Sequence, residues 1–282
     1  MRVLLVPNTG NPRALDVARE LVAHLDALGH TPVLAEDDAL AAGLDDRALS
    51  AANLGVPDLV VALGGDGTIL KAVHVLGGTD SRILGLNLGR LGFLSGADGS
   101  DPVGSVDAAL AGEGTLERRM TLAAEVTVGG RQAGAYRALN EVYVGRGASH
   151  RAVEIAVHVA GEELTRFVCD GVIVATATGS TAYALSAGGP IMAPEASGVL
   201  LVPVAPHTLR VRPLLLGPDS IVELVLGNPG RSEACVVIDG DTVPCRSSLD
   251  LVTVRRDTRD VTLVRLDGRH FHRVLRDTFL RG

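Results

Sequence analysis

The sequence predicts two domains of different class: an α/β domain with a parallel, Rossmann-like sheet over residues 1–117, and an all-β domain over residues 118–266. Three observations predict this division. Short apolar segments alternate with helical patterns before residue 110, apolar residues recur with a period of two from Leu122 onward, and residues 268–280 return to a helical pattern. We expect this last helix, within residues 267–282, to return to the first domain and pack on it, because its apolar stripe must be buried.

The first domain contains predicted strands separated by predicted helices. The strands cover residues 3–6, 31–35, 58–63 and 82–86, and the helices cover residues 12–28, 68–76 and 102–110. The first helix repeats apolar side chains at helical spacing and stops at Gly29. Short apolar strands joined through helices indicate a parallel sheet covered on both faces, and such sheets bind ligands at the carboxyl ends of their strands.

The second domain contains segments that alternate or run apolar between Gly-rich turns. They cover residues 123–128, 153–159, 222–226 and 249–255. This period of two is typical of an antiparallel sheet with one buried face, so we expect an all-β domain.

The composition and charge of the chain indicate which partners it can bind and in which cellular compartment we expect it. The chain has 282 residues, 46% of them hydrophobic, and a formal net charge of -7. Basic residues are scattered singly, so nucleic acid and anionic membranes are poor candidates as partners. No apolar run approaches a membrane span or a signal peptide, and the three cysteines, Cys169, Cys235 and Cys245, lack metal or disulfide spacing. We therefore expect a cytoplasmic protein with free thiols.

The run Gly-Gly-Asp-Gly-Thr at 64–68 follows the predicted strand at 58–63. Its glycines let backbone N–H groups approach a phosphate, and the following helix points its positive end at the same place. Asp66 would repel phosphates unless it binds a cation or accepts a proton, so its presence favours phosphoryl transfer. The alternative is an ordinary strand-to-helix turn. The run is not a P-loop, because no Gly-Lys-Ser/Thr follows and Lys71, the single lysine, comes too late.

Three polar clusters lie in the second half of the chain. Asn140 and Glu141 begin an apolar segment and could read ribose hydroxyls and a base edge, or simply end a strand in solvent. Residues 169–190 combine an apolar strand with a cluster of hydroxyl groups around Tyr183, which exceeds what one helix cap requires. The third cluster, Ile-Asp-Gly-Asp at residues 238–241, is explained just as well by a hairpin turn as by a functional role.

Taken together these motifs resemble the NAD kinase family. The family signature of GGDGT, Asn-Glu, Gly-Ser-Thr-Ala-Tyr and Gly-Gly-Pro stands here at 64–68, 140–141, 179–183 and 188–190. Segments 87–93 and 206–213 also look like family segments, and the resemblance covers nearly the whole chain in order. One departure is Ala177, where a proline is frequent in the family.

The resemblance implies transfer of the terminal phosphoryl group of ATP, or of polyphosphate, to the adenosine 2′-hydroxyl of NAD, which gives NADP. Asp66 would act as the catalytic base, and the donor phosphates would be held by Gly64, Gly65, Gly67 and Thr68. The resemblance assigns NAD binding to Asp66, Gly67, Phe93, Asn140, Glu141, Asp170, Thr178, Thr181, Ala182, Tyr183 and Ser186. It also implies Mg²⁺ held mainly through substrate phosphates, with no dedicated metal-binding residues.

Two alternatives stay open. A lipid kinase of the related superfamily would need an apolar cleft and has no obvious use for the cluster at 178–186. A non-catalytic NAD(P)-sensing module would bind the dinucleotide but has no reason to keep a carboxylate at Asp66. The resemblance further implies a homodimer or homotetramer.

Overall fold

A computed structural model of the chain describes residues 1–89, 92–148, 151–208, 210–227, 234–244, 249–266, 268 and 271–280. The family-like segments at 87–93 and 206–213 therefore fall partly outside the described residues. The chain divides into two compact units, one formed by Met1–Arg118 with Val261–Gly282 and the other by Arg119–Asp260.

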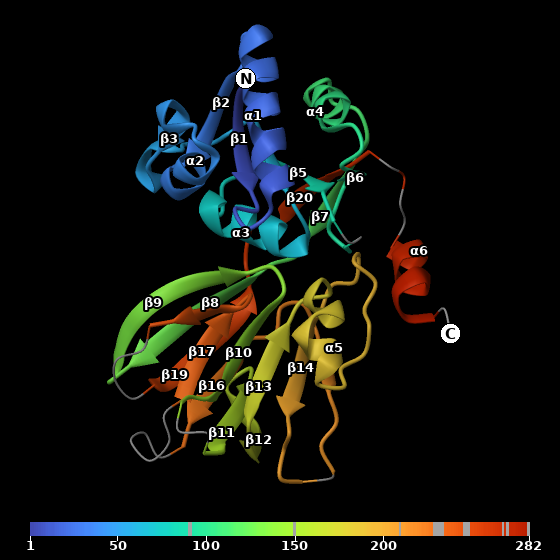
Figure 1. Cartoon of the computed structure of the whole chain (residues 1–282). Coiled ribbons are helices and arrows are strands. Elements are labelled where there is room, and N and C mark those ends of the chain that lie inside the picture. The colour runs from blue at the N-terminus through green and yellow to red at the C-terminus, as the bar shows by residue number, and fades with distance from the viewer. Residues whose placement is uncertain are drawn as a thin grey trace. The chain divides into compact units, whose positions relative to one another are not determined.

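The first unit is an α/β domain (Figure 1). Its strands are β1 (Arg2–Pro7), β2 (Thr31–Ala35), β3 (Ala48–Leu49), β4 (Leu59–Leu63), β5 (Arg82–Asn87), β6 (Ala97–Asp98), β7 (Thr115–Arg119) and β20 (Val261–Arg265). Its helices are α1 (Pro12–Ala27), α2 (Glu36–Ala42), α3 (Asp66–Leu76), α4 (Pro102–Leu110) and α6 (Phe271–Leu275). The sheet order is β3-β2-β1-β4-β5-β20-β7, with β6 beside β5. The predicted parallel sheet is confirmed, because β1, β2, β4 and β5 pair in parallel.

Helices cover both faces of this sheet. Side chains of α1, α2 and α4 share one core with Val3, Leu5 and Val61 of the strands. On α3, Ile69 is fully buried outside that core. A Cβ at Gly85 would lie 2.4 Å from Ile69 Cδ1, so the glycine lets α3 approach β5 closely. This packing fixes the start of α3 at the carboxyl ends of the strands.

The last strand of the first sheet comes from the end of the chain. β20 pairs in parallel with β5, and Figure 1 shows it in red beside that strand. The expected boundary at 266 is therefore corrected, since residues 261–265 belong to the first unit and the division falls after Asp260. The physical reason is that a short apolar strand has the same pattern in either sheet, so periodicity does not reveal which partner it chooses.

The terminal helix returns to the first domain, as predicted. α6 is followed by a π-helical turn, Arg276–Leu280. The ring of Phe93 lies 5.8 Å from the ring of Phe271 and 6.0 Å from that of Phe279, measured between centroids. The apolar stripe therefore packs on the segment that follows β5.

The second unit is all-β. Its strands are β8 (Leu122–Val128), β9 (Arg131–Ala138), β10 (Glu141–Arg146), β11 (Val153–Val159), β12 (Glu162–Cys169), β13 (Gly171–Ala175), β14 (Val199–Val204), β15 (Leu214–Leu216), β16 (Val222–Leu226), β17 (Ala234–Ile238), β18 (Asp241–Val243) and β19 (Leu249–Arg256). One short helix, α5 (Tyr183–Ser186), follows a 3₁₀ turn at Gly179–Thr181. The sheet orders are β15-β14-β13-β10-β17-β18 and β12-β11-β16-β19-β8-β9.

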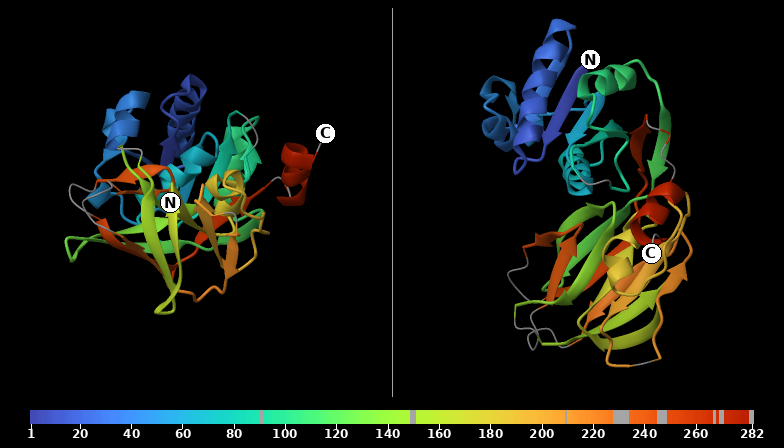
Figure 2. Two further views of the ribbon diagram at one scale, coloured as in Figure 1. Left: turned by 90° about the horizontal axis from the view of Figure 1, so that it is seen from below. Right: turned by 45° about the vertical axis from the view of Figure 1, so that its right-hand side comes forward.

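The two sheets of this unit share one core (Figure 2). Val142 and Val172 of one sheet and Ile155 and Val252 of the other are fully buried in it. On the opposite side of β13, Ile173 and Ala175 belong to a smaller core with Ala184 of α5. The α5 segment therefore covers the outer face of the sheet that contains β10 and β13.

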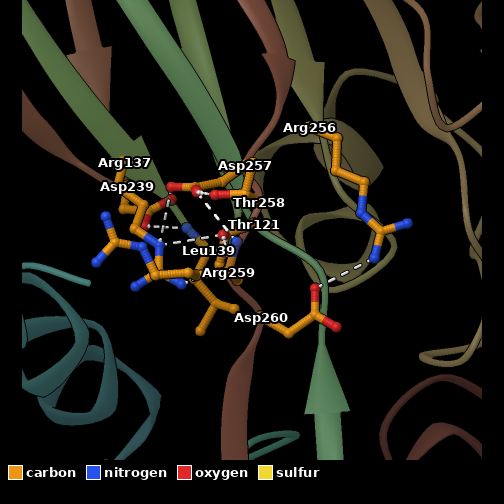
Figure 3. Close-up of polar contacts among 9 residues, drawn as sticks. All are labelled: Thr121, Arg137, Leu139, Asp239, Arg256, Asp257, Thr258, Arg259 and Asp260. Carbon is orange, nitrogen blue, oxygen red and sulfur yellow. Dashed lines mark hydrogen bonds and ion pairs between the residues drawn. The ribbon is translucent and has the colours of Figure 1, made fainter. Parts of the chain in front are cut away.

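Arg137, a partly buried arginine, contacts both segments through which the chain enters and leaves the second unit (Figure 3). Arg137 Nε donates to Thr121 Oγ1 at 3.1 Å and Nη2 donates to Arg259 O at 2.6 Å, while Asp257 Oδ2 lies 3.3 Å from Nε. Burial lowers the pKa of Arg137, and the charge of Asp257 opposes this shift.

Two further expectations concern cysteines and membranes. Cys169 is a free thiol whose pKa burial raises to about 11. The Cys235 thiol donates to Arg146 O at 3.3 Å, and Cys245 lies outside the described residues. Within the part of the chain that the structure describes, no helix has the length and apolar character needed to cross a membrane.

Candidate active site

The Gly-rich turn lies at the carboxyl end of β4, where the sequence places it. α3 begins at Asp66, two residues earlier than expected, with Gly65 at its N-cap. A Cβ at Gly64 would lie 2.3 Å from Thr68 Oγ1, so this position requires glycine unless the threonine moves. The first N–H groups of a helix lack acceptors within it, so this end of α3 favours an anion.

The carboxylate of Asp66 is held by a segment 27 residues further along the chain. Phe93 N donates to Asp66 Oδ2 at 2.9 Å, and Leu94 N donates to Oδ1 at 3.1 Å. A Cβ at Gly92 would lie 2.0 Å from Oδ1, so only glycine lets the backbone come this close. Each oxygen keeps a further lone pair for another donor. The Asp66 carboxylate is therefore oriented by a distant segment of the chain.

An open pocket of about 290 Å³ adjoins the turn. It is lined by Pro7, Asn8, Thr9, Gly65, Gly67, Thr68 and Lys71. Sequence reasoning missed Asn8, Thr9 and Lys71. Two signals could have found them: β1 and β4 are parallel neighbours that end at the same edge, and Lys71 follows Gly67 by one helical turn.

Lys71 brings a positive charge to this pocket. Its Nζ forms an ion pair with Asp38 Oδ1, and the Asp38 side chain is only 1% exposed. Burial raises the pKa of Asp38, and the hydrogen bond from Lys71 opposes that shift. The second carboxylate oxygen, Oδ2, has no hydrogen-bond partner among the described residues. Asp38 thus holds the only lysine of the chain at the pocket.

The donor atoms at the turn suit Mg²⁺ only in a limited way. No group of three His, Cys, Asp or Glu side chains comes together among the described residues. Asp66 offers one carboxylate with free lone pairs beside the phosphate-favouring end of α3. Mg²⁺ commonly uses one or two carboxylates and completes its shell with water and substrate phosphates. The residues present fit such an ion. Asp66 would contribute one carboxylate ligand, and the remaining ligands would come from water and substrate phosphates.

In the second unit, Asp239 organises the Asn140–Glu141 pair. Its Oδ2 accepts from Leu139 N at 2.6 Å (Figure 3). Its Oδ1 accepts from Asn140 N at 2.8 Å and from Glu141 N at 2.9 Å. Asp239 and Gly240 form the β17–β18 hairpin turn, both with positive φ, 48° and 96°. Sequence reasoning identified the turn and missed its carboxylate, because the contact spans about a hundred residues of chain.

Glu141 is buried, which does not agree with a solvent-exposed strand end. Glu141 is the first residue of β10 and is 8% exposed. Its Oε2 has no hydrogen-bond partner among the described residues. Burial raises its pKa to about 7, the charge of Asp239 adds to the rise, and a hydrogen bond from the Tyr183 backbone opposes it. Glu141 is therefore a buried acceptor next to α5.

Several side-chain hydroxyls of residues 176–186 form hydrogen bonds that fix the backbone conformation of this segment. Thr176 Oγ1 donates to Leu139 O at 2.6 Å, and Ser180 Oγ donates to Ala177 O at 2.6 Å. Thr178 Oγ1 accepts from Arg119 Nη1 at 3.1 Å, and Thr181 Oγ1 donates to Thr178 O at 3.2 Å. Many of these hydroxyls thus shape the segment, whereas Ser186 on α5 is exposed.

A close backbone approach fixes this segment to the Asn140–Glu141 pair. A Cβ at Gly179 would lie 2.1 Å from Asn140 O. Thr176 N also donates to Asn140 O at 2.9 Å. Asn140, Glu141, Thr178, Thr181, Ala182 and Tyr183 are therefore gathered at one end of β10 and β13.

Asp170 lies at the other end of the same strands. Gly145 of β10 pairs with Gly171 of β13, and Arg146 Nη1 lies 3.0 Å from Asp170 Oδ1. The two regions are linked by Tyr143, whose hydroxyl donates to Asp170 O at 2.8 Å and whose ring lies 5.6 Å from the half-exposed ring of Tyr183. A Cβ at Gly145 would lie 2.0 Å from the Tyr143 hydroxyl, so glycine makes room for the tyrosine. Glu141, Tyr183, Tyr143 and Asp170 form one elongated row.

The residues predicted to form the site thus fall into two groups. Gly64, Gly65, Asp66, Gly67 and Thr68 lie together in the first unit, and Phe93 joins them through its backbone while its ring packs on the terminal helix. The remaining residues lie in the second unit, where Asp170 stands apart from the cluster around Glu141.

Family models match most of the chain. The ATP-NAD kinase N-terminal domain matches residues 45–113, and the ATP-NAD kinase C-terminal domain matches residues 139–266. The NAD kinase of Thermoanaerobacter sp. is 33% identical over 277 residues, which are 98% of each chain. The NAD kinase of Symbiobacterium thermophilum is 38% identical over 275 residues, which are 96% of each chain.

Two solved structures share the fold. Yeast NADH kinase complexed with NADH has a TM-score of 0.89 at 26% identity, covering 99% of this chain and 87% of that chain. An NAD kinase from Archaeoglobus fulgidus in complex with ATP has a TM-score of 0.74 at 26% identity, covering 100% of each chain. These matches extend over both units and include every motif described above, and the chain therefore belongs to the NAD kinase family of phosphotransferases.

Proposed function

We propose that this protein transfers the terminal phosphoryl group of ATP, or of inorganic polyphosphate, to the adenosine 2′-hydroxyl of NAD and so forms NADP. The observation that carries the proposal is the Asp66 carboxylate, oriented by two backbone N–H groups at the N-terminus of α3 beside a pocket with a lysine. The similarity to an NADH kinase bound to NADH and an NAD kinase bound to ATP supports both substrates.

The donor phosphates are assigned to the Gly-rich turn. Gly65 and Gly67 contribute backbone N–H groups, Thr68 adds a hydroxyl, and the end of α3 favours negative charge. The N–H of Gly64 already donates to Leu86 O at 3.0 Å, so Gly64 serves the turn by letting Thr68 come close. Lys71 lines the same pocket and supplies a neutralising charge. Mg²⁺, when bound, neutralises the phosphates further and is held mainly by their oxygens.

The acceptor is assigned to the second unit. Asn140 and Glu141 hold the adenosine ribose. Glu141 Oε2, which has no partner among the described residues, accepts from one of its hydroxyls. The residues that frame adenine are Thr178, Thr181, Ala182, Tyr183 and Ser186. Asp170 binds another part of NAD, and Tyr143 connects it to Tyr183. Phe93 completes the NAD-binding set.

In this mechanism Asp66 accepts the proton of the NAD 2′-hydroxyl while the 2′-oxygen forms a bond to the terminal phosphorus of the donor. The bond to the bridging oxygen breaks, and ADP or a shortened polyphosphate leaves with the electron pair. Positioning and charge neutralisation supply most of the rate enhancement in phosphoryl transfer. A carboxylate whose two oxygens are already oriented needs little reorganisation to accept the proton.

The proposal is tested with purified protein, Mg²⁺, and each donor in turn. We expect NADP from NAD with ATP or polyphosphate, no phosphorylation of diacylglycerol, and competitive inhibition by NAD that lacks the adenosine 2′-oxygen. Phosphorylated lipid would favour the lipid kinase alternative. Tight NAD binding without any product would favour the sensing module.

Location and assembly belong to the same proposal. We expect a cytoplasmic homodimer or homotetramer, since most oligomers are symmetric assemblies of identical chains. Light scattering over a range of protein concentrations measures the assembly, and a monomer throughout would contradict it.

A further inference from the structure

Arg265, the last residue of β20, holds the segment that holds Asp66. The arginine is 8% exposed. Its Nη2 donates to Phe93 O at 2.9 Å, its Nη1 donates to Ser95 O, and its Nε donates to Glu117 Oε2 at 2.6 Å. A buried guanidinium requires a countercharge and acceptors, and Glu117 with the two carbonyls supplies both.

The same short segment contacts Arg265 through its carbonyls and Asp66 through its N–H groups. Phe93 O and Leu94 N belong to one peptide unit, so Arg265 Nη2 binds its oxygen while Asp66 Oδ1 binds its N–H. Hydrogen bonds in such a chain polarise one another, and the cation therefore strengthens the N–H donor. This arrangement links Arg265 to Asp66 through a single peptide group.

Packing leaves the segment little freedom to move by itself. A Cβ at Gly96 would lie 1.9 Å from Val264 O, and Leu266 N donates to Gly96 O at 2.8 Å. The backbone after Ser95 is thus fixed to β20, and the guanidinium sets the orientation of the peptide groups before it.

We propose that Arg265, with Glu117 as its counterion, is a positioning residue that aligns the N–H groups of Phe93 and Leu94 on the Asp66 carboxylate. This inference rests on the proposed role of Asp66 as the base. A planar guanidinium reaches two carbonyls and a carboxylate at once, whereas an ammonium is a point charge without this fork. Arg265→Lys therefore keeps the charge and removes the geometry.

The alternative is a purely structural clip between β20 and β7. The two roles differ in a double-mutant cycle with Asp66→Asn, because a residue that acts only through Asp66 has nothing left to position once the base is gone. A structural clip would instead lower activity in either background.

The experiment measures kcat and KM for NAD and ATP in Arg265→Lys, Asp66→Asn and the double variant. We expect Arg265→Lys to lower kcat by about tenfold or more, with each KM within about twofold, because misplacing a reacting group affects the chemical step. The double variant should be no slower than Asp66→Asn.

The matched control is Arg255→Lys, because Arg255 also lies on a strand and pairs with a glutamate, Glu125, at 3.0 Å. We expect wild-type kinetics for this control.

A second readout does not depend on activity. Backbone amide exchange at Phe93 and Leu94 should speed up in Arg265→Lys and stay unchanged in Arg255→Lys. This measurement decides the inference even if the wild type makes no NADP, which would defeat the proposed function alone. Should Arg265→Lys fail to fold, Glu117→Gln replaces it, with a kcat loss of about threefold or more and the same lack of additivity with Asp66→Asn. Additive losses in the cycle, or wild-type exchange and kcat in the variants, would overturn the proposal.

Discussion

Asp66 and Glu141 are the two carboxylates to which we assign the central roles in the proposed reaction, and they are held in opposite ways. Asp66 accepts one backbone N–H on each oxygen, and a glycine gives it room. Glu141 is buried beside the carboxylate of Asp239, and one of its oxygens lacks a partner among the described residues. The comparison teaches that the first carboxylate receives its hydrogen-bond donors from its own unit, whereas the second keeps an acceptor atom that a hydroxyl of the proposed ligand would satisfy.

The largest effect should come from removing the oriented carboxylate. Asp66→Asn is nearly isosteric, so the fold should survive while kcat falls about a hundredfold or more, the usual scale for a positioned base. Steady-state kinetics measure this loss, and Asp16→Asn, an exposed carboxylate on α1, is the control. Near-normal turnover would show that Asp66 is a turn residue and would favour the sensing module.

Removing the unsatisfied carboxylate should have a smaller and different effect. Glu141→Ala deletes an acceptor for the ribose, so NAD binding and turnover should weaken together, with kcat/KM lower by about tenfold, as expected for one hydrogen bond to a charged group. Titration calorimetry with NAD, beside kinetics, checks both parts. A loss confined to kcat would contradict a role in ribose positioning.

The pH dependence of stability provides a third comparison. Burial raises the pKa of Glu141 from 4.5 to about 7, so the folded protein binds a proton there that the unfolded chain has released. This group's contribution to stability is full below pH 4.5 and is lost as pH rises through about 7. Glu141→Gln should therefore be more stable than wild type at pH 8, by up to about 3 kcal/mol, with little difference at pH 4.5. Urea unfolding at both pH values measures this, and equal differences would contradict it.

The smallest effect should come from removing the terminal helix, which packs on the segment that holds Asp66. Truncation after residue 267 removes the rings of Phe271 and Phe279 that pack on Phe93. We expect a melting temperature lower by a few degrees, about what the loss of one or two aromatic contacts causes, and reduced solubility. An unchanged melting curve would show that the helix adds nothing to the first unit.

The sequence by itself determined the two fold classes and the position of each motif. Local patterns carry this information, since a glycine-rich turn after an apolar strand and a period of two are set by neighbouring residues. For this reason the turn at the end of β4, the strand at Glu141 and the returning terminal helix were all predictable.

Only the tertiary structure decided which distant groups hold these motifs. Phe93 and Leu94 reach Asp66, Asp239 reaches the backbone of Asn140, Asp38 holds Lys71, and β20 joins the first sheet. Each of these contacts joins residues 27 or more positions apart, and no local period records such a pairing. The choice depends on which backbones pack closely enough for one polar group to meet another, which the whole fold settles at once.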